Sequence, residues 1–318
     1  MNHLQTRTEV FTIEYPWAEE LMKTQLTKCF WTADEILVEK DVHDVLTNLT
    51  ESEKHGVFTT LKLFTLYELK AGAEYWCNRF IRAFPRHELS SMGAAFGMME
   101  LCVHKPFYNK INELLNASNT EFYTDYVNNP TLSSRMKSID EIIDDQDDLV
   151  SLGGFTMVEG VILYSNFAFL KHFQSLGKNK LLNIVRGINF SARDENLHAV
   201  GGSIVFKELK NQIGITEEQV AKIINIAKTI YEHEEKIIDM IFEKGPIEGI
   251  TSEDLKNFVK SRINICLSNL NIPSIYDVDN NPIAEWFYNS INAYQSNDFF
   301  SGGGREYTRD WSEEKFVW

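Results

Sequence analysis

The chain has 318 residues, 46 of them acidic and 31 basic, and its formal net charge at pH 7 is −15. This acidic balance excludes a general nucleic-acid-binding protein, which needs a basic surface to displace counterions. The 7 prolines and 17 glycines are few for a loop-rich or all-β chain, and 43% hydrophobic residues suffice for a large core. The four cysteines form no Cys-x-x-Cys pair and the first residues lack a signal-peptide pattern, so a reduced, cytoplasmic protein is expected.

Long helices are expected along most of the chain, and no alternating strand pattern lies between turn signals. Thr50 followed by Glu53 is a capping-box pattern, which opens a helix that extends to about Phe84 and is ended by Pro85. The later helices are expected at about residues 88–116, 132–148, 155–175, 179–211, 217–244 and 252–269. The pattern therefore predicts an all-α fold.

The apolar helix at 155–175 follows Ser151-Leu-Gly-Gly154, a segment that is expected to break the chain. This helix is long enough to cross a membrane, but it contains Glu159 and Asn166. A buried core helix with a functional carboxylate accounts for these polar residues, so no membrane association is expected.

Several of these helices carry glutamate or histidine on the face that their apolar residues predict to be inward. The apolar or small neighbours on that face are Leu61, Phe64 and Thr65 for Glu68, Phe155, Val158, Ile162 and Phe167 for Glu159, and Val185, Ile188, Ala192 and Ala199 for Glu195 and His198. A buried, unpaired carboxylate is costly, and it usually becomes neutral or binds a cation. A group of carboxylates with imidazoles suits a divalent metal, because the metal supplies the compensating charge.

The same order of side chains occurs twice, a lone glutamate followed by a glutamate with a histidine one turn later. The first set is Glu68, Glu100 and His104, and the second is Glu159, Glu195 and His198. Any single pair of this kind is also found on solvated helix surfaces, but the doubled order is typical of ferritin-like bundles that hold two metal ions between four helices. The sequence therefore predicts a ferritin-like bundle with a di-metal carboxylate centre.

Ser191-Ala-Arg-Asp-Glu-Asn-Leu-His198 resembles the ARDExLH signature of the class I ribonucleotide reductase small subunit, the radical-generating β subunit. The resemblance extends from about Trp31 to the last helix and implies two bound ions, either two Fe, two Mn or one of each. It assigns the metal ligands to Glu68, Glu100, His104, Glu159, Glu195 and His198. It also implies that Tyr108, four residues after the first histidine, carries the radical. Trp31, Asp194 and His104 match the radical-transfer relay of the family.

The chain departs from the family pattern where Glu100-Leu-Cys-Val-His104 replaces Glu-x-x-His and is one residue longer. Pro106 follows and cannot donate a backbone hydrogen bond to the carbonyl of Cys102. We predict a π-type bulge near residues 100–106 that absorbs the extra residue and keeps both side chains on the metal. Leu163 and Ser191 also replace bulkier residues that shield the tyrosine in the family.

The last residues lack the helical pattern of the rest of the chain. Ser301-Gly-Gly-Gly304 is expected to be a flexible hinge, and the residues after it are rich in acidic and aromatic side chains. We expect a ferritin-like domain over 1–298 and a tail over 299–318 that binds the large subunit. Tyr307 is the candidate for passing the radical onward, with Trp311 as the alternative. The resemblance also implies a homodimer.

These observations predict that the metal centre oxidises Tyr108 and that the hole passes to a large subunit, which reduces ribonucleotides to deoxyribonucleotides. One alternative is a di-metal oxidase that acts on a small molecule, which requires an open apolar pocket beside the metals. The other is an iron-binding storage protein, which needs neither a tail nor a redox partner.

Overall fold

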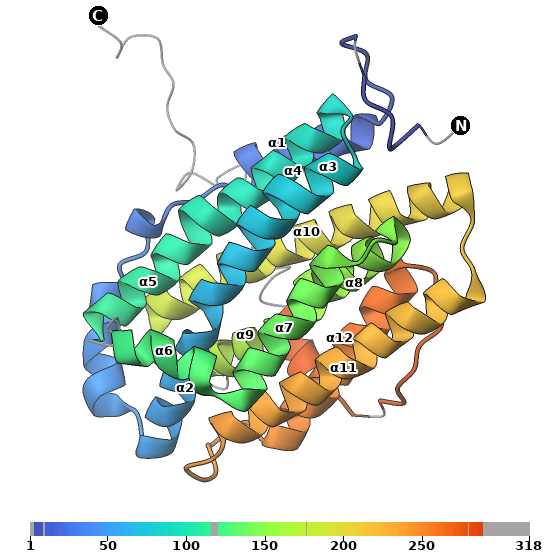
Figure 1. The fold of residues 1–318 in the computed structure, drawn as a ribbon. Coiled ribbons are helices and arrows are strands. Elements are labelled where there is room, and N and C mark those ends of the chain that lie inside the picture. The colour runs from blue at the N-terminus through green and yellow to red at the C-terminus, as the bar shows by residue number, and fades with distance from the viewer. Residues whose placement is uncertain (1–2, 9, 116–119, 176, 279, 289–318) are drawn as a thin grey trace, which may run out of the picture.

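The computed structural model describes residues 3–8, 10–115, 120–175, 177–278 and 280–288, and within these ranges it contains helices and one isolated bridge but no strand. The α-helices are α1 (Pro16–Thr27), α2 (Glu51–Leu69), α3 (Ile81–Ala83), α4 (His87–Met99), α5 (Lys105–Leu114), α6 (Thr120–Asn128), α7 (Pro130–Asp144), α8 (Asp148–Val161), α9 (Tyr164–Lys171), α10 (Leu182–Ile213), α11 (Glu217–Ile241) and α12 (Ser252–Asn269). Short helical segments are η1 (Ala33–Glu35), η2 (Val38–Asp41), η3 (Asp44–Asn48), η4 (Lys70–Phe80), η5 (Glu100–His104) and η6 (His172–Gln174). The prediction of an all-α helical bundle is confirmed (Figure 1).

The predicted capping box at the start of α2 is present. The backbone N–H of Glu53 donates to Thr50 Oγ1 at 3.2 Å, and the backbone N–H of Thr50 donates to Glu53 Oε2 at 2.9 Å. The helical run continues through the π-helical segment η4 into α3 and ends before Pro85, as expected. The π-helical stretch η4 was not predicted.

The expected break at Ser151–Gly154 is wrong, because these residues lie inside α8. The helix begins earlier, where Asp147 accepts hydrogen bonds from the backbone N–H groups of Leu149 and Val150. A Cβ at Gly153 would lie 2.8 Å from Ile223, and one at Gly154 would lie 2.9 Å from Ile142. The two glycines therefore serve close helix packing, and the break comes later, between α8 and α9.

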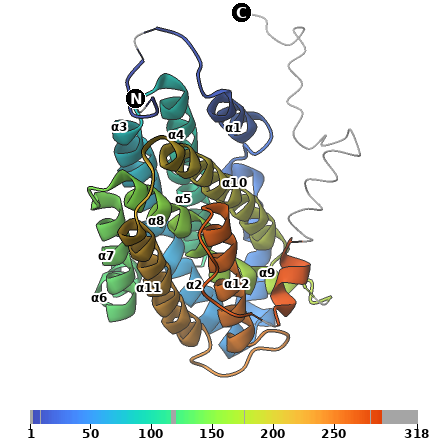
Figure 2. The ribbon, with the colours of Figure 1, turned by 90° about the vertical axis from the view of Figure 1, so that its right-hand side faces the viewer.

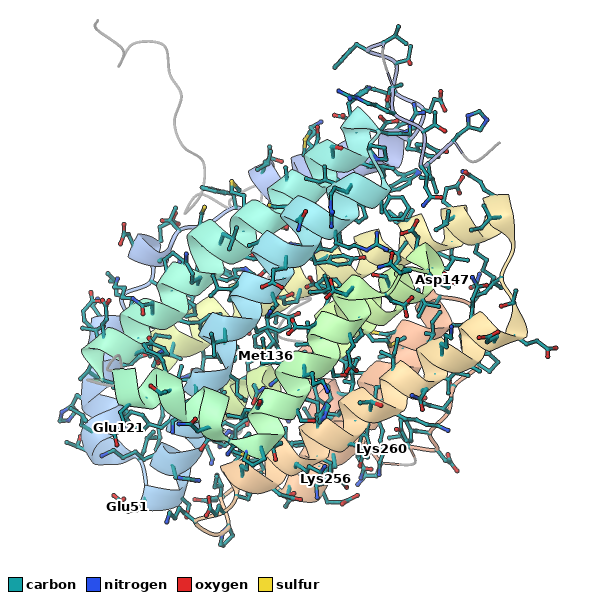
Figure 3. All side chains as sticks on the ribbon, in the orientation of Figure 1. Glu51, Glu121, Met136, Asp147, Lys256 and Lys260 are labelled. Atoms are coloured by element: carbon teal, nitrogen blue, oxygen red, sulfur yellow. The ribbon has the colours of Figure 1, made fainter. Side chains whose placement is uncertain are left out.

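The apolar run Asp148–Gln174 is long and apolar enough to cross a membrane, yet its residues are buried inside the bundle. Helices α7, α10, α11 and α12 all contact α8, and the rotated view shows α10, α11 and α12 in front of it (Figure 2). The prediction of a buried core helix is confirmed. Charged side chains such as Glu51 and Glu121 instead extend from the outer surface (Figure 3).

A buried ion pair joins α7 to α11. Arg135 Nε lies 3.5 Å from Glu234 Oε1, and Ser165 Oγ of α9 donates to Glu234 Oε2 at 2.7 Å. Burial raises the pKa of Glu234 to about 7, although the charge of Arg135 and the bond from Ser165 oppose this rise. The carboxyl group therefore titrates near neutral pH.

The raised pKa of Glu234 makes stability depend on pH. In the unfolded chain the carboxyl has its ordinary pKa of 4.5, so its stabilising contribution is complete below that pH and is lost as the pH rises through about 7. We expect the free energy of unfolding of the wild type, relative to Glu234→Gln, to fall by roughly 2 to 3 kcal/mol between pH 5 and pH 8. Urea denaturation of both proteins across this range measures the difference, and parallel pH curves would contradict it.

Candidate metal centre

Six side chains from four helical runs meet in the interior of the bundle. Glu68 comes from α2, Glu159 from α8, and the two glutamate–histidine pairs come from η5 and α10. Each of these side chains is at most 1% exposed. The structure thus brings together all of the residues that the sequence analysis assigned as metal ligands.

The first group surrounds Nδ1 of His104. This atom lies 2.9 Å from Glu100 Oε2, 3.4 Å from Glu195 Oε1 and 3.6 Å from Glu68 Oε2. One ligand atom from each of the four residues lies within 4.8 Å of the others, which is close enough for one cation to contact all of them.

The second group surrounds Nδ1 of His198. This atom lies 2.8 Å from Glu100 Oε1, 3.7 Å from Glu159 Oε2 and 3.8 Å from Glu195 Oε2. Glu100 and Glu195 belong to both groups, and each places a different oxygen near each histidine. This sharing would allow Glu100 and Glu195 to contribute to two adjacent cation positions.

The chemistry of the donor set fits two divalent ions. Four carboxylates carry a charge of −4 when they are all ionised, and two divalent cations carry +4. Both oxygens of Glu68 and of Glu195 have no hydrogen-bond partner among the described residues, although they are buried. Buried carboxylate oxygens normally have a partner, so this set suits a cation better than it suits protein donors.

The pKa shifts within the two groups arise from burial and from the charges of neighbouring members of the groups. Burial, followed by the charge of Glu100, raises the pKa of Glu68 well above its usual range, and burial with the charge of Glu195 does so for Glu159. Burial opposes ionisation of Glu100 as well, but the charge of His104 and nearby hydrogen bonds hold its pKa well below the usual range. Protons therefore offset the crowded negative charge in the protein alone, and bound cations would displace them.

The predicted π-type bulge is confirmed. Residues Glu100–His104 form the π-helical segment η5, in which the backbone N–H of Lys105 donates to the carbonyl oxygen of Glu100. Because a π-helix has more residues per turn than an α-helix, a spacing of four brings both side chains to the same face. The extra residue is absorbed here, and α5 continues with Pro106 in its first turn.

The second ring nitrogen of each histidine, Nε2, contacts a side chain that belongs to neither group. Asp194 Oδ2 lies 3.1 Å from His104 Nε2 and accepts a hydrogen bond from Trp31 Nε1 at 2.8 Å. One carboxylate oxygen thus joins the tryptophan to the histidine, in the order that the family relay implies. Such partners orient a metal-binding imidazole and select its tautomer.

Two residues of the site were missed in the sequence analysis. Gln25 Oε1 lies 3.2 Å from His198 Nε2, and Trp76 Nε1 donates to Glu159 Oε1 at 2.6 Å. Gln25 is a polar residue on the buried face of α1, and Trp76 follows Glu68 by eight residues, a spacing that places two residues on one face of a helix. Those patterns are present in the sequence, but helix α1 itself was not predicted.

Tyr108 lies beside the first group and is fully buried. Its ring stacks on Phe64 with centroids 4.2 Å apart, and its hydroxyl has no hydrogen-bond partner among the described residues. Burial, followed by the charge of Glu68, raises the pKa of Tyr108 well above its usual range. The environment therefore disfavours a phenolate. The other predicted relay residue, Tyr307, and the alternative Trp311 lie outside the described residues.

The family model of the ribonucleotide reductase small chain matches residues 7–282. The chain belongs to this family. It is 26% identical over 342 aligned residues to the probable ribonucleoside-diphosphate reductase small subunit 048L of Invertebrate iridescent virus 3, covering 96% of this chain and 86% of that protein.

Solved structures of this family share the fold. A putative class I ribonucleotide reductase from Bacillus halodurans has a TM-score of 0.77 at 23% identity and covers 88% of this chain and 100% of its own. The dimanganese(II)-NrdF of Streptococcus sanguinis has a TM-score of 0.75 at 22% identity and covers 87% of this chain and 97% of its own. Together with the two groups described above, membership of the family indicates a di-metal site.

Proposed function

We propose that this chain is the radical-generating subunit of a class I ribonucleoside-diphosphate reductase and that Tyr108 is the residue oxidised. The observation that carries the proposal is a fully buried tyrosine beside two ligand groups that share Glu100 and Glu195. When bound, two ions of iron or manganese, or one of each, would supply the oxidising power once oxygen or a reduced oxygen species had oxidised them. One solved relative is a dimanganese protein by name, which keeps manganese among the candidates.

The surroundings of Tyr108 suit the loss of an electron and a proton together. Since its phenolate is disfavoured, removal of an electron must be accompanied by transfer of the hydroxyl proton. Glu68 is the carboxylate whose charge acts most strongly on Tyr108, so it is the candidate acceptor of that proton in the metal-loaded protein. The stacked ring of Phe64 and the complete burial of Tyr108 keep water from the oxidised ring.

His104, Asp194 and Trp31 provide the path away from the centre in this proposal. The hydrogen bonds through Asp194 Oδ2 connect the imidazole to the indole without an intervening water. We expect the hole to pass along this path and through the tail at 299–318 to the large subunit. The homodimer and the cytoplasmic location are proposed on the family resemblance alone.

The alternative oxidase needs an open apolar pocket beside the metals. A groove of about 470 Å³ lies between α7, α8 and α11, and it is lined by residues such as Glu141, Glu218 and Lys222 but by none of the six proposed ligands. This groove is therefore not the substrate pocket that the alternative oxidase requires.

Tyr108→Phe tests the proposal. We expect the variant to bind two ions like the wild type but to lose the tyrosyl doublet in electron paramagnetic resonance and all turnover with the large subunit. Removing the buried, unpartnered hydroxyl should also stabilise the metal-free protein by about 1 kcal/mol. Tyr75→Phe is the control, because Tyr75 is also buried but stacks on Phe155. A doublet that persists in Tyr108→Phe would overturn the assignment, and its loss in Tyr75→Phe would then place the radical on Tyr75.

A further inference from the structure

Helix α8, which carries Glu159, ends inside the protein. Its last residue is Val161, and the turn residues Ile162 and Leu163 are at most 2% exposed. The carbonyl groups of a final helical turn have no partner within the helix, and here water does not reach them. The backbone N–H of Ile162 donates to the carbonyl oxygen of Val158 at 3.2 Å, and side chains of neighbouring helices donate to those of Gly160 and Ile162.

Two buried arginines supply these donors. Arg262 Nε of α12 donates to the carbonyl oxygen of Gly160 at 3.0 Å, and Arg135 Nη2 of α7 donates to that of Ile162 at 3.4 Å. Both arginines are at most 2% exposed. Cations at the C-terminal end of a helix also offset the partial negative charge of its aligned carbonyls.

The sequence at the helix end allows α12 to approach closely. A Cβ at Gly160 would lie 2.3 Å from Cys266 Sγ of α12, which is shorter than any real contact. Only glycine at this position lets α12 come near enough for Arg262 to reach the carbonyl. Gly160 directly follows Glu159, so the contact is one residue from the carboxylate.

Arg262 differs from Arg135 in what balances its charge. Arg135 is paired with Glu234, whereas no carboxylate lies within ion-pair distance of Arg262 among the described residues. Its guanidinium instead lies 3.8 Å from the centre of the Tyr164 ring, and Nη1 donates to the hydroxyl of Tyr288 at 3.1 Å. A buried cation without an acidic partner is costly, so a compensating role at the end of α8 is expected.

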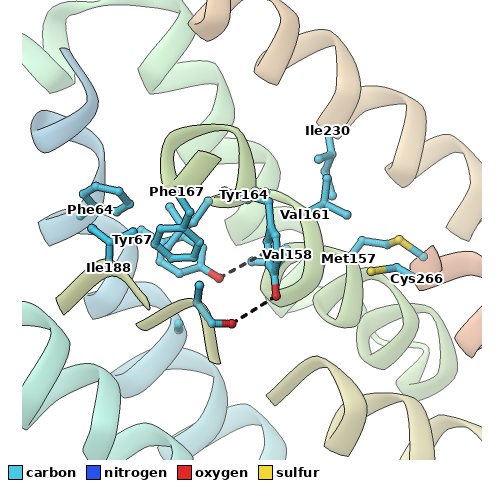
Figure 4. Close-up of a cluster of buried hydrophobic side chains, with 14 of the residues drawn as sticks. Phe64, Tyr67, Met157, Val158, Val161, Tyr164, Phe167, Ile188, Ile230 and Cys266 are labelled. Carbon is cyan, nitrogen blue, oxygen red and sulfur yellow. Dashed lines mark hydrogen bonds between the residues drawn. The ribbon is translucent and has the colours of Figure 1, made fainter. Parts of the chain in front are cut away.

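We infer that Arg262, assisted by Arg135, is a positioning residue that caps the buried end of α8 and so holds Glu159 at the metal centre. The inference rests on the proposed function, because it takes Glu159 to be a metal ligand. Tyr67 adds to the same end of the helix, since its hydroxyl donates to the carbonyl oxygen of Val158 at 3.3 Å (Figure 4).

The test is titration of the metal-free full-length protein with Mn²⁺ alone, with free Mn²⁺ followed by electron paramagnetic resonance. We expect the wild type to bind two ions and Arg262→Gln to bind the second ion about 10- to 100-fold more weakly, the range seen when a partner of a metal ligand is removed. Arg262→Lys should recover most of this loss, because an ammonium group can still donate to the Gly160 carbonyl.

Arg86→Gln is the matched control. Arg86 is equally buried at 2% exposure but pairs with Glu14 and Glu88, so its loss should lower the melting temperature without changing either Mn²⁺ affinity. Unchanged affinities in Arg262→Gln, or an equal loss in Arg86→Gln, would overturn the inference.

A second variant keeps the test valid if Arg262→Gln does not fold. Arg135→Gln combined with Glu234→Gln removes a buried cation and its acidic partner together, and it should weaken the second ion through the Ile162 carbonyl. Wild-type affinity in this double variant would then overturn the inference. If the wild type itself binds fewer than two ions, the proposed function fails instead.

Discussion

Glu100→Ala is expected to abolish binding of both metal ions. Its two carboxylate oxygens lie 2.9 Å from His104 Nδ1 and 2.8 Å from His198 Nδ1, so it is shared by both ligand groups. Loss of an outer partner of a ligand lowers metal affinity by 10- to 100-fold, and loss of a shared ligand should lower each affinity by at least about 100-fold. Mn²⁺ titration of the metal-free variant measures this effect.

Glu88→Ala is the control for this substitution. Glu88 is equally buried in α4, which leads directly into η5, but it pairs with Arg86 and accepts hydrogen bonds from the backbone of Glu14 and Tyr15. Removing it leaves the buried Arg86 with the half-exposed Glu14 as its remaining acidic partner and should destabilise the protein by about 3 kcal/mol while two ions still bind. Retention of both ions by Glu100→Ala would show that neither ion depends on Glu100 as a shared ligand.

Deletion of Cys102 is expected to leave the metal centre intact. Cys102 is an exposed residue within η5, and its removal should convert the π-helical turn into an α-helical one with the family spacing of Glu-x-x-His. The residues of α5 keep their direction, because the π turn already contains one residue more than the helix requires. Two ions should bind with affinities within about tenfold of the wild type.

Deletion of Ala94 is the matched comparison. Ala94 is also exposed and lies in the regular part of α4, where the loss of one residue rotates the following side chains by about 100°. The π turn η5 could restore the direction of α5 after this deletion. Glu100 stands at the start of η5, however, so its side chain would still be rotated away from the centre. We expect this deletion to abolish two-metal binding. Equal effects of the two deletions would contradict the role given to the π turn.

Much of the site could be predicted from the sequence because its signals are local. The repeated order of Glu and of Glu with His depends only on helical periodicity, and it selects the six residues that meet in the structure. The bulge at Glu100–His104 could be predicted from one extra residue and Pro106. The capping box at Thr50 likewise involves residues three apart.

Tertiary structure alone decided the features that join distant parts of the chain. Gly153 and Gly154 resemble a break in sequence, but closely packed neighbouring helices make them part of α8. His198 and its partner Gln25 are 173 positions apart, and no local periodicity relates them. Beside the break after Val161, arginines from two other helices donate to backbone carbonyl groups, and no local pattern predicts these contacts. A helix terminus inside a core forms only where other elements satisfy its carbonyl groups, and which elements do so is set by packing.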